Sequence, residues 1–503
     1  MYWRAAARSP ACQQTIAAVG NVAASCSAEP TRRHSPIASA ASAAGAAPKP
    51  GLTGTPITLD SNADLTGGYD AATTAAGTTY IAWIAAHGSA NRTVYLCILP
   101  PGKTACAGGI KSTPSLTGTS AQGIHVIVAG STVTLVWFHD TPQSVDGPEN
   151  AKIATATVQN GVLSAAHDQA PAPSFGILED VAAGPGGTIW TVTAHSGTQS
   201  LQVVPGLGNK PVTVPTPYLV STNQGAQLAF AGSTPLMVIQ MGGSIGDPIA
   251  YASEVNGKWS AFKDVANTWT AGANLGLAQT TSGVRALASI DNASYQPVVT
   301  RWTGSSFSPR QLTGDRNPCA PSSHDPVADA SGRMADISME CGDVAVANLT
   351  DTLHAAIVRF ANGGTFGGGP PQLATTPRGH AWAVWSIEGT SNSILFAGPV
   401  LLPGRDVPAQ ATGQSNQVKL TGPASCLPPV GIAVKVAGTP ATGWQVTSSS
   451  LALDGKAFSG TTLDGSTLTA GSSHTLTGTV TFTKGGTHLP VTATLKFKSC
   501  PNP

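Results

Sequence analysis

A glycine followed by a short apolar strand recurs seven times along this chain, and the recurrence constrains the fold more than any other feature. The first copy, GTTYIAWIAAH, begins at Gly77, and the others begin at Gly130, Gly187, Gly232, Gly283, Gly332 and Gly379. Successive copies are 53, 57, 45, 51, 49 and 47 residues apart. This is the length of one four-stranded blade, so the repeats predict an all-β chain with a seven-bladed β-propeller over residues 51–404.

Each repeat is expected to contain a strand before the glycine and further strands after it. In the first repeat these are residues 69–75 and 93–99, and in the sixth repeat we assign the third strand to residues 353–360. The seventh repeat lacks a fourth strand of its own. We therefore expect residues 56–59, which precede the first repeat, to supply it and so close the ring.

The composition argues against a nucleic-acid partner and against a membrane-spanning segment. Only 10% of the residues are charged, against about 25% in an average protein, and the net charge is +1 without a basic run. The electrostatic signature of nucleic-acid binding is therefore missing. Outside the alanine-rich beginning no apolar stretch reaches membrane-spanning length, so no integral membrane segment is expected. We expect a monomer.

Residues 1–50 are rich in Ala, Ser and Pro and carry Arg4 and Arg8 before a mildly apolar run. This pattern is typical of a signal peptide or a disordered leader, and it predicts an exported protein at the cell surface or outside the cell. The cysteines agree with export, because six of the eight group as neighbouring pairs. The expected disulfides are Cys97 with Cys106, Cys319 with Cys341, and Cys426 with Cys500.

The C-terminal part has a character of its own. Residues 405–422 contain Pro, Gln and Gly and are interpreted as a linker. Residues 423–503 contain LDGK followed by TLTAGSSHTLTGTVTF. This motif resembles bacterial immunoglobulin-like domains, in which a DG hairpin precedes a turn and strand of the type aGsHtL. The resemblance implies an immunoglobulin-like β-sandwich, and it implies no activity.

A first column, with Asp or Gly in six repeats of seven, stands seven positions before each glycine. Its members are Asp70, Gly123, Asp180, Gly225, Gly276, Asp325 and Gln372. One position earlier stand Tyr69, Gln122, Glu179, Gln224, Leu275, His324 and Pro371. Turn chemistry alone favours Gly and Asp at such positions. The alternative is that Asp70, Asp180 and Asp325 point toward the channel axis and bind a cation or a sugar hydroxyl.

A second column marks the end of the strand after each glycine. It reads His87, His139, His195, Gln240, Asp291, Glu340 and Glu388. Because the start of the first strand and the end of the second meet at one rim, both columns are candidates for a binding rim. The three histidines are candidate ligands of a divalent cation, and exposed histidines without a ligand are the alternative. No other cofactor is indicated.

Several known catalytic motifs are missing from the sequence, and their absence argues against the enzyme classes that use them. The segment GPGGTIW at residues 184–190 resembles the aspartate-box turn of sialidases, which share a propeller fold, but it lacks the expected Ser and Asp. The similarity therefore concerns the fold alone. Nucleophile-elbow, zinc-protease, phosphate-loop and dinucleotide motifs are absent from the sequence.

These observations favour an exported binding or scaffold protein that engages a glycan or a protein at the rim. A second hypothesis is a carbohydrate-active hydrolase or lyase that uses Asp70, Glu179, Asp180 or Asp325 as acid or base. A third is a structural component of a cell wall or coat. The sequence alone does not decide whether the protein is an enzyme.

Overall fold

The computed structural model describes the strands and many connecting turns between residues 51 and 499. Residues 1–50 and 500–503, and stretches between strands of which the longest are 141–151, 313–323, 349–356 and 363–370, lie outside the described residues. The described part is all-β apart from two short 3-10 turns, η2 (Leu65–Gly67) and η3 (Pro185–Gly187). Among the described residues no helix has the length and apolar character needed to cross a bilayer.

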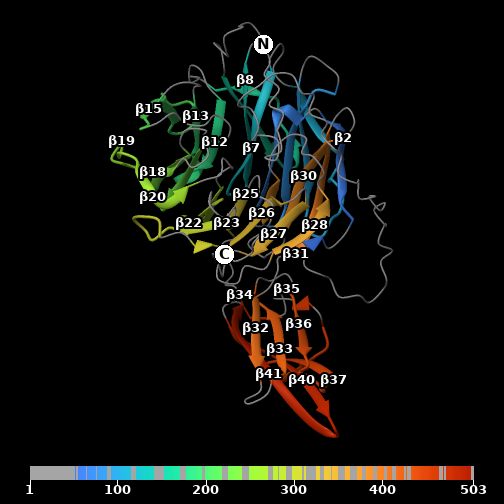
Figure 1. The fold of residues 1–503 in the computed structure, drawn as a ribbon. Helices are drawn as coiled ribbons and strands as arrows, with labels where there is room; N and C mark the ends of the chain where they lie inside the picture. Colours follow the sequence, from blue (N-terminus) through green and yellow to red (C-terminus); the bar gives the residue numbers. More distant parts are fainter. Residues whose placement is uncertain are drawn as a thin grey trace, which may run out of the picture. The chain divides into compact units, whose positions relative to one another are not determined.

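Residues 51–401 form seven antiparallel sheets of four or five strands within the described part (Figure 1). Sheet 1 comprises β3 (Tyr69–Thr73), β4 (Thr79–Ala85), β5 (Thr93–Leu99) and β6 (Lys111–Pro114). Sheet 2 comprises β7 (Ser120–Ala129), β8 (Thr132–Asp140), β9 (Lys152–Gln159), β10 (Val162–Leu163) and β11 (His167–Asp168). Sheet 3 comprises β12 (Ile177–Ala183), β13 (Ile189–Ala194), β14 (Ser200–Val204) and β15 (Val212–Pro215).

The remaining four sheets repeat this plan. Sheet 4 comprises β16 (Ala226–Ala231), β17 (Thr234–Gln240), β18 (Pro248–Val255), β19 (Lys258–Trp259) and β20 (Lys263–Trp269). Sheet 5 comprises β21 (Gly276–Thr280), β22 (Gly283–Ile290), β23 (Pro297–Arg301) and β24 (Gln311–Leu312). Sheet 6 comprises β25 (His324–Ala328), β26 (Met334–Glu340), β27 (Asp343–Asn348) and β28 (Ile357–Asn362). Sheet 7 comprises β29 (Gln372–Thr375), β30 (Ala381–Glu388), β31 (Ser393–Leu401), β1 (Gly51–Leu52) and β2 (Ile57–Ala63).

The first strands of the sheets lie side by side in chain order. Strand β3 contacts β7, β7 contacts β12, and the series continues through β16, β21, β25 and β29. Strand β29 in turn contacts β3, so the series of first strands closes on itself.

The recurrent glycine makes the turn between the first two strands of a sheet. Gly77, Gly130, Gly187 and Gly232 all have positive φ, between 63° and 90°. A residue with a β-carbon is strained in this conformation, which explains why the sequence places glycine there. Gly283 is instead the first residue of β22, whereas Gly332 and Gly379 lie outside the described residues.

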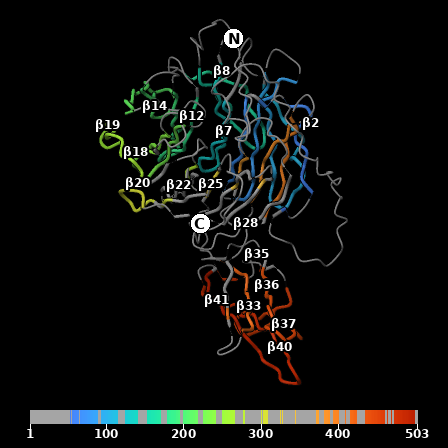
Figure 2. Tube along the Cα trace, in the orientation of Figure 1, coloured from blue at the N-terminus to red at the C-terminus, as the bar shows by residue number. Residues whose placement is uncertain are grey.

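The N-terminal segment completes sheet 7, as the missing fourth strand predicted. Strand β2 pairs with β31, with Ile57 opposite Ala397 and Thr58 opposite Phe396, and β1 pairs with the end of the same strand. Figure 2 shows β2, near the blue start of the described chain, beside the orange strands of sheet 7. Pairing the two ends of the repeat region covers the outer edge of β31.

The predicted third strand of the sixth repeat is wrong. The third strand of sheet 6 is β27 (Asp343–Asn348), which follows β26 after only two residues, and the segment assigned to it overlaps the fourth strand, β28. The prediction assumed a connection as long as those in the other repeats. Because this connection is short, the third and fourth strands of the sheet lie earlier in the sequence than an average repeat would place them.

Alternating residues of the second strand of sheet 1 pack against the sheets on either side. In β4, Ile81 and Trp83 belong to a core shared with sheet 7, whereas Ala82 and Ile84 belong to a core shared with sheet 2. Both sets are fully buried, with at most 1% of each residue exposed. A strand buried on both faces in this way needs apolar side chains throughout, which explains the run YIAWIA.

The C-terminal part is also all-β. One sheet contains β32 (Arg405–Gln410), β33 (Gln417–Gly422) and β36 (Lys435–Thr439). The other contains β34 (Cys426–Leu427), β41 (Thr487–Ser499), β40 (Ser473–Lys484), β37 (Gln445–Leu453) and β38 (Lys456–Phe458), and β35 (Ile432–Ala433) pairs with β39 (Thr462–Leu463). A core that includes Leu420, Leu476 and Phe482, all fully buried, lies among these strands.

Residues 405–422, interpreted above as a linker, contain two of these strands. Strand β32 pairs with β33, and β33 pairs with β36. Val418 and Leu420 are buried, whereas Gln417 before them and Lys419 between them are exposed. This alternation is typical of a half-buried strand, but the Pro, Gln and Gly around it obscured the pattern in the sequence.

Candidate functional site

The aspartates of the first column bond to the backbone of the neighbouring sheet. The Val126 amide donates to Oδ2 of Asp70 at 2.6 Å, and the Leu228 amide donates to Oδ2 of Asp180 at 2.6 Å. The Leu373 amide donates to Oδ2 of Asp325, also at 2.6 Å. Each aspartate is on the first strand of its sheet and each donor is on the first strand of the next. These carboxylates therefore join sheets 1 and 2, 3 and 4, and 6 and 7; we call them the aspartate ties.

Strand register explains why the aspartates reach a neighbouring sheet. Asp70 lies opposite Ala82, Asp180 opposite Val192, and Asp325 opposite Ile337. All three cross-strand partners are fully buried. Asp70 and Asp325 are the second residues of β3 and β25, and Asp180 is the fourth residue of β12, so each is paired within its strand. A short carboxylate at these positions can reach the adjacent first strand.

Two of the ties have perturbed acidities. Desolvation by burial raises the pKa of Asp70 to about 6, although the Val126 and Ala71 amides bond to its carboxylate and oppose that rise. Desolvation likewise raises the pKa of Asp180 to about 7, against hydrogen bonds from Leu228 and Val181, and the negative charge of Asp70 adds to the increase. Burial thus disfavours the charged form more strongly than two amide donors favour it.

Glu179 and Tyr69, next to the ties, are buried. Glu179 is 2% exposed, and its Oε2 accepts a hydrogen bond from the Gly225 amide at 2.9 Å, which adds a second contact between sheets 3 and 4. Tyr69 is 6% exposed, and burial raises the pKa of its hydroxyl. Both side chains were predicted as rim residues, and here they belong to the packed interior.

The second column differs from one sheet to the next. In sheet 1, His87 follows β4, has a positive φ of 46°, and exposes 40% of its side chain. Its Nε2 lies 2.7 Å from Oδ2 of Asp60, and the same oxygen accepts a hydrogen bond from Nε1 of Trp83 at 2.9 Å. Asp60 is on β2, so one nearly buried carboxylate joins the closing strand to sheet 1. The His87 ring also stacks on Tyr95, with 5.1 Å between centroids.

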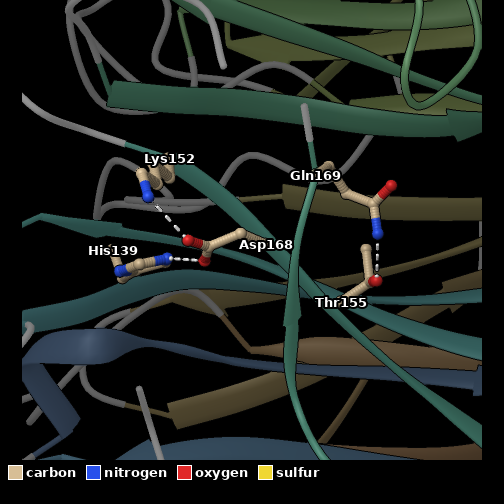
Figure 3. A network of polar contacts seen from close by, with 5 residues as sticks. All are labelled: His139, Lys152, Thr155, Asp168 and Gln169. Atoms are coloured by element: carbon tan, nitrogen blue, oxygen red, sulfur yellow. Dashed lines mark hydrogen bonds and ion pairs between the residues drawn. The ribbon is translucent and has the colours of Figure 1, made fainter. Parts of the chain in front are cut away.

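In sheet 2, His139 occupies the same column but is buried, with 3% of the residue exposed. Its Nε2 lies 2.7 Å from Oδ1 of Asp168, and Nζ of Lys152 donates to the other carboxylate oxygen at 2.8 Å (Figure 3). Desolvation alone would raise the pKa of Asp168, but the bonds from Lys152 and His139 outweigh it and lower the pKa. Beside this group, Nε2 of Gln169 donates to Oγ1 of Thr155 at 2.7 Å, as Figure 3 also shows.

The other predicted rim residues differ in exposure, and several lie outside the described part. Gln240 is buried, whereas Glu388 is exposed. Outside the described residues lie His195, Gln224 and Asp291. Only the backbone is described for Gln122, His324 and Glu340. Because His195 lies outside the described residues, the trio of histidines stays a prediction. Among the described residues, no group of three or more His, Cys, Asp or Glu side chains could hold a metal.

The Cys97–Cys106 disulfide is present, with an S–S distance of 2.07 Å. It joins β5 to the loop that follows it. Cys319, Cys341 and Cys500 lie outside the described residues, so the other two predicted disulfides stay predictions. Strand β34 pairs in parallel with the end of β41, with Leu427 opposite Ser499, which brings the segment of Cys426 close to the end of the described chain.

Sequence reasoning missed the carboxylates that hold the histidines. Asp60 and Asp168 lie outside both columns, on β2 and β11, and neither follows the glycine by a constant offset. The tryptophan at similar offsets in several repeats was a usable signal, because a buried indole N–H needs an acceptor. For Trp83 that acceptor is Asp60.

The C-terminal part contains a further polar group at the motif that resembles immunoglobulin-like domains. Nδ1 of His474 lies 2.7 Å from Oδ2 of Asp454, and its Nε2 lies 2.6 Å from Oγ of Ser472. Asp454 also accepts the Thr475 amide at 2.8 Å, and the Ser472 hydroxyl donates to the Thr469 carbonyl. The hydrogen bond from His474, followed by that from Thr475, lowers the pKa of Asp454. These bonds fix the DG hairpin to the start of β40.

No protein-family model and no curated protein sequence matches the chain. Similar solved structures include a protein of unknown function from Dyadobacter fermentans, with 12% identity, coverage of 68% of this chain and 97% of the other, and a TM-score of 0.41. They also include AofleA from Arthrobotrys oligospora (10% identity, 61% and 89% coverage, TM-score 0.40) and an ulvan lyase of polysaccharide lyase family PL25 (10% identity, 70% and 95% coverage, TM-score 0.40). Similarity at this level carries no argument about the activity of this chain.

Proposed function

We propose that the seven sheets are the blades of a seven-bladed β-propeller over residues 51–404 and that residues 405–503 form an immunoglobulin-like β-sandwich. The closed series of first strands and the pairing of β2 with β31 support the ring. Two sheets around one apolar core support the sandwich, and so does the DG hairpin between β37 and β38 of the larger sheet.

The function that this arrangement supports best is binding or scaffolding by an exported protein, with a glycan or a protein as ligand. The aspartate ties carry the proposal, because the carboxylates expected to do chemistry are bonded to backbone amides of neighbouring sheets. Carboxylates in that role maintain the ring, which leaves the loops and strand ends for recognition.

Export is part of the proposal. The Cys97–Cys106 disulfide supports it, because such bonds persist in oxidising compartments. Because few residues are charged, we also propose that binding depends only weakly on the salt concentration.

One observation favours the enzyme alternative. A pKa of about 7 gives Asp180 the acidity of a general acid near neutral pH, and Glu179 is the adjacent residue. Against this, the Val181 and Leu228 amides each occupy one oxygen of Asp180. A carbohydrate-active hydrolase or lyase would have to break one of these bonds to engage its substrate.

The test combines a glycan array with a hydrolysis and lyase screen on the full chain, Asp180→Asn, and a control variant at the exposed Asp264. Asparagine keeps an acceptor oxygen and cannot act as a general acid. We expect glycan binding without product formation in all three proteins. Product formed by the wild type and by the Asp264→Asn control, and lost in folded Asp180→Asn, would establish the enzyme instead.

A further inference from the structure

Three aromatic rings form a stack at one end of sheet 1. The Trp83 and Tyr95 rings lie 5.5 Å apart with 19° between their planes, and the Tyr95 and His87 rings lie 5.1 Å apart with 20° between their planes. Trp83 is buried, with 1% exposed, and the His87 side chain is 40% exposed. The stack therefore begins in the core between sheets and ends at the surface in the imidazole.

The exposed ring is held firmly. Tyr95 covers one of its faces, Asp60 binds its Nε2 at 2.7 Å, and its backbone has a φ of 46°, a conformation that few residues other than glycine adopt. Asp60 is itself fixed, because Trp83 donates to Oδ2 and the Asn62 amide donates to Oδ1 at 3.1 Å. A ring fixed in this way loses little conformational entropy when a ligand covers it.

The hydrogen-bonding pattern sets the chemistry that His87 offers. In the neutral imidazole, an Nε2–H that donates to the Asp60 carboxylate leaves the lone pair on Nδ1, so this form presents an acceptor together with a flat face. The face suits the C–H surface of a pyranose, and the lone pair suits a sugar hydroxyl as donor. The exposed large apolar residues of the described part, such as Ile110 and Val212, are scattered over different sheets and form no comparable platform.

We propose that His87 is the floor of a sugar subsite, where a neutral pyranose stacks on the imidazole and donates a hydroxyl hydrogen bond to Nδ1. The proposal rests on the glycan-binding function proposed above and assigns that function to one position on the molecule. Tyr95 and Asp60 are positioning residues, since they act on the sugar only through His87.

The experiment measures binding of wild type, His87→Ala, His87→Phe and His167→Ala on a glycan array. It then titrates the methyl glycosides of glucose, galactose, mannose and fucose while observing the histidine ring signals by NMR. His167 is a matched control, because it is an exposed histidine on β11 of the next sheet. We expect His87→Ala to weaken binding by roughly tenfold or more, His87→Phe to retain part of it through stacking, and His167→Ala to bind as the wild type does. A glycoside that binds should shift the His87 signals and leave those of His167 in place.

The outcomes separate the two proposals. Wild type that binds glycans, with folded His87→Ala binding equally well and unmoved His87 signals, would overturn the subsite and leave the binding function standing. Wild type that binds no glycan in either measurement would overturn the glycan-binding function and the subsite together. Thermal unfolding of each variant shows whether a loss of binding is a loss of folding.

Discussion

The two polar columns that flank the repeated glycine are used in opposite ways. The first-column aspartates of sheets 1, 3 and 6 make the same bond, a carboxylate oxygen to an amide of the next sheet at 2.6 Å. The second-column histidines of sheets 1 and 2 make different contacts, one exposed on an aromatic stack and one buried beside Asp168 and Lys152.

The difference shows that contacts at the first-column position can recur from sheet to sheet, whereas contacts at the second-column position vary. A first strand has neighbours on both sides in every sheet, so the same contact can recur around the ring. The end of a second strand meets loops of different length and sequence, so its residue adapts to local partners. Function is expected where the repeat varies, and stability where it does not.

Removing the closing strand should lower the stability most, because it removes Asp60 as well as one edge of the ring. Deletion of residues 51–60 takes away β1 and three of the four paired residues of β2, together with Leu59, of which only 4% is exposed. We expect the free energy of unfolding to fall by at least about 3 kcal/mol, the cost of deleting one large buried side chain. Thermal and denaturant unfolding measure it, and an unchanged melting temperature would show that β2 does not close the ring.

The aspartate ties should rank next. Replacing Asp180 by Ala leaves the Leu228 amide without its acceptor, and an orphaned buried amide costs about 1–3 kcal/mol. Asp70→Ala and Asp325→Ala should each cost a similar amount, measured by denaturant unfolding at pH 6. Asp264→Ala, on the exposed part of β20, is the control and should change stability by less than about 0.5 kcal/mol. If all four variants are as stable as the wild type, the first-column residues serve only to form turns.

Replacing His139 or His87 should cause smaller losses of stability, and the two losses should differ. His139→Ala removes a buried ring and the partner of Asp168, so we expect a loss of about 1–2 kcal/mol. His87→Ala removes a ring that is 40% exposed and should cost less than about 1 kcal/mol. The same unfolding measurement serves both, and a larger loss for His87 than for His139 would reverse the assignment of surface and core.

The sequence predicted local features well, because the glycine turn and the strands around it depend on neighbouring residues. The missing strand of the seventh repeat also predicted the closing strand. The aspartate ties could not be predicted, because Asp70 and Val126 are 56 residues apart and nothing in one repeat indicates which amide faces it. The short connection before β27 departed from the average repeat on which the prediction relied. The alternation of Val418 and Leu420 was hidden within a polar stretch that contains Pro, Gln and Gly.

The contribution of Asp180 to stability should also depend on pH. The native pKa of Asp180 is about 7 and its ordinary value is 3.8, so between these values the native state keeps a proton that the unfolded state has lost. Stability from this group is therefore fully present below about pH 4 and declines as the pH rises to about 7. His125, whose pKa burial lowers to about 4, acts in the opposite direction between about pH 4 and 6.5.

Comparison with Asp180→Asn isolates the aspartate, because His125 is present in both proteins. The stability of wild type minus that of the variant should fall by on the order of 1 kcal/mol or more from pH 4 to pH 7.5. Denaturant unfolding across this range measures the difference. A difference that is flat or that rises with pH would contradict the burial of this carboxyl group.

Amide hydrogen exchange at Leu228 tests the aspartate ties most directly, with Asp180→Ala compared with wild type under native conditions. The tie predicts that the Leu228 amide exchanges at least tenfold faster in the variant, while the amide of Met237, its cross-strand partner, is affected less. The same exchange rate at Leu228 in both proteins would show that the carboxylate of Asp180 does not hold sheet 4 to sheet 3.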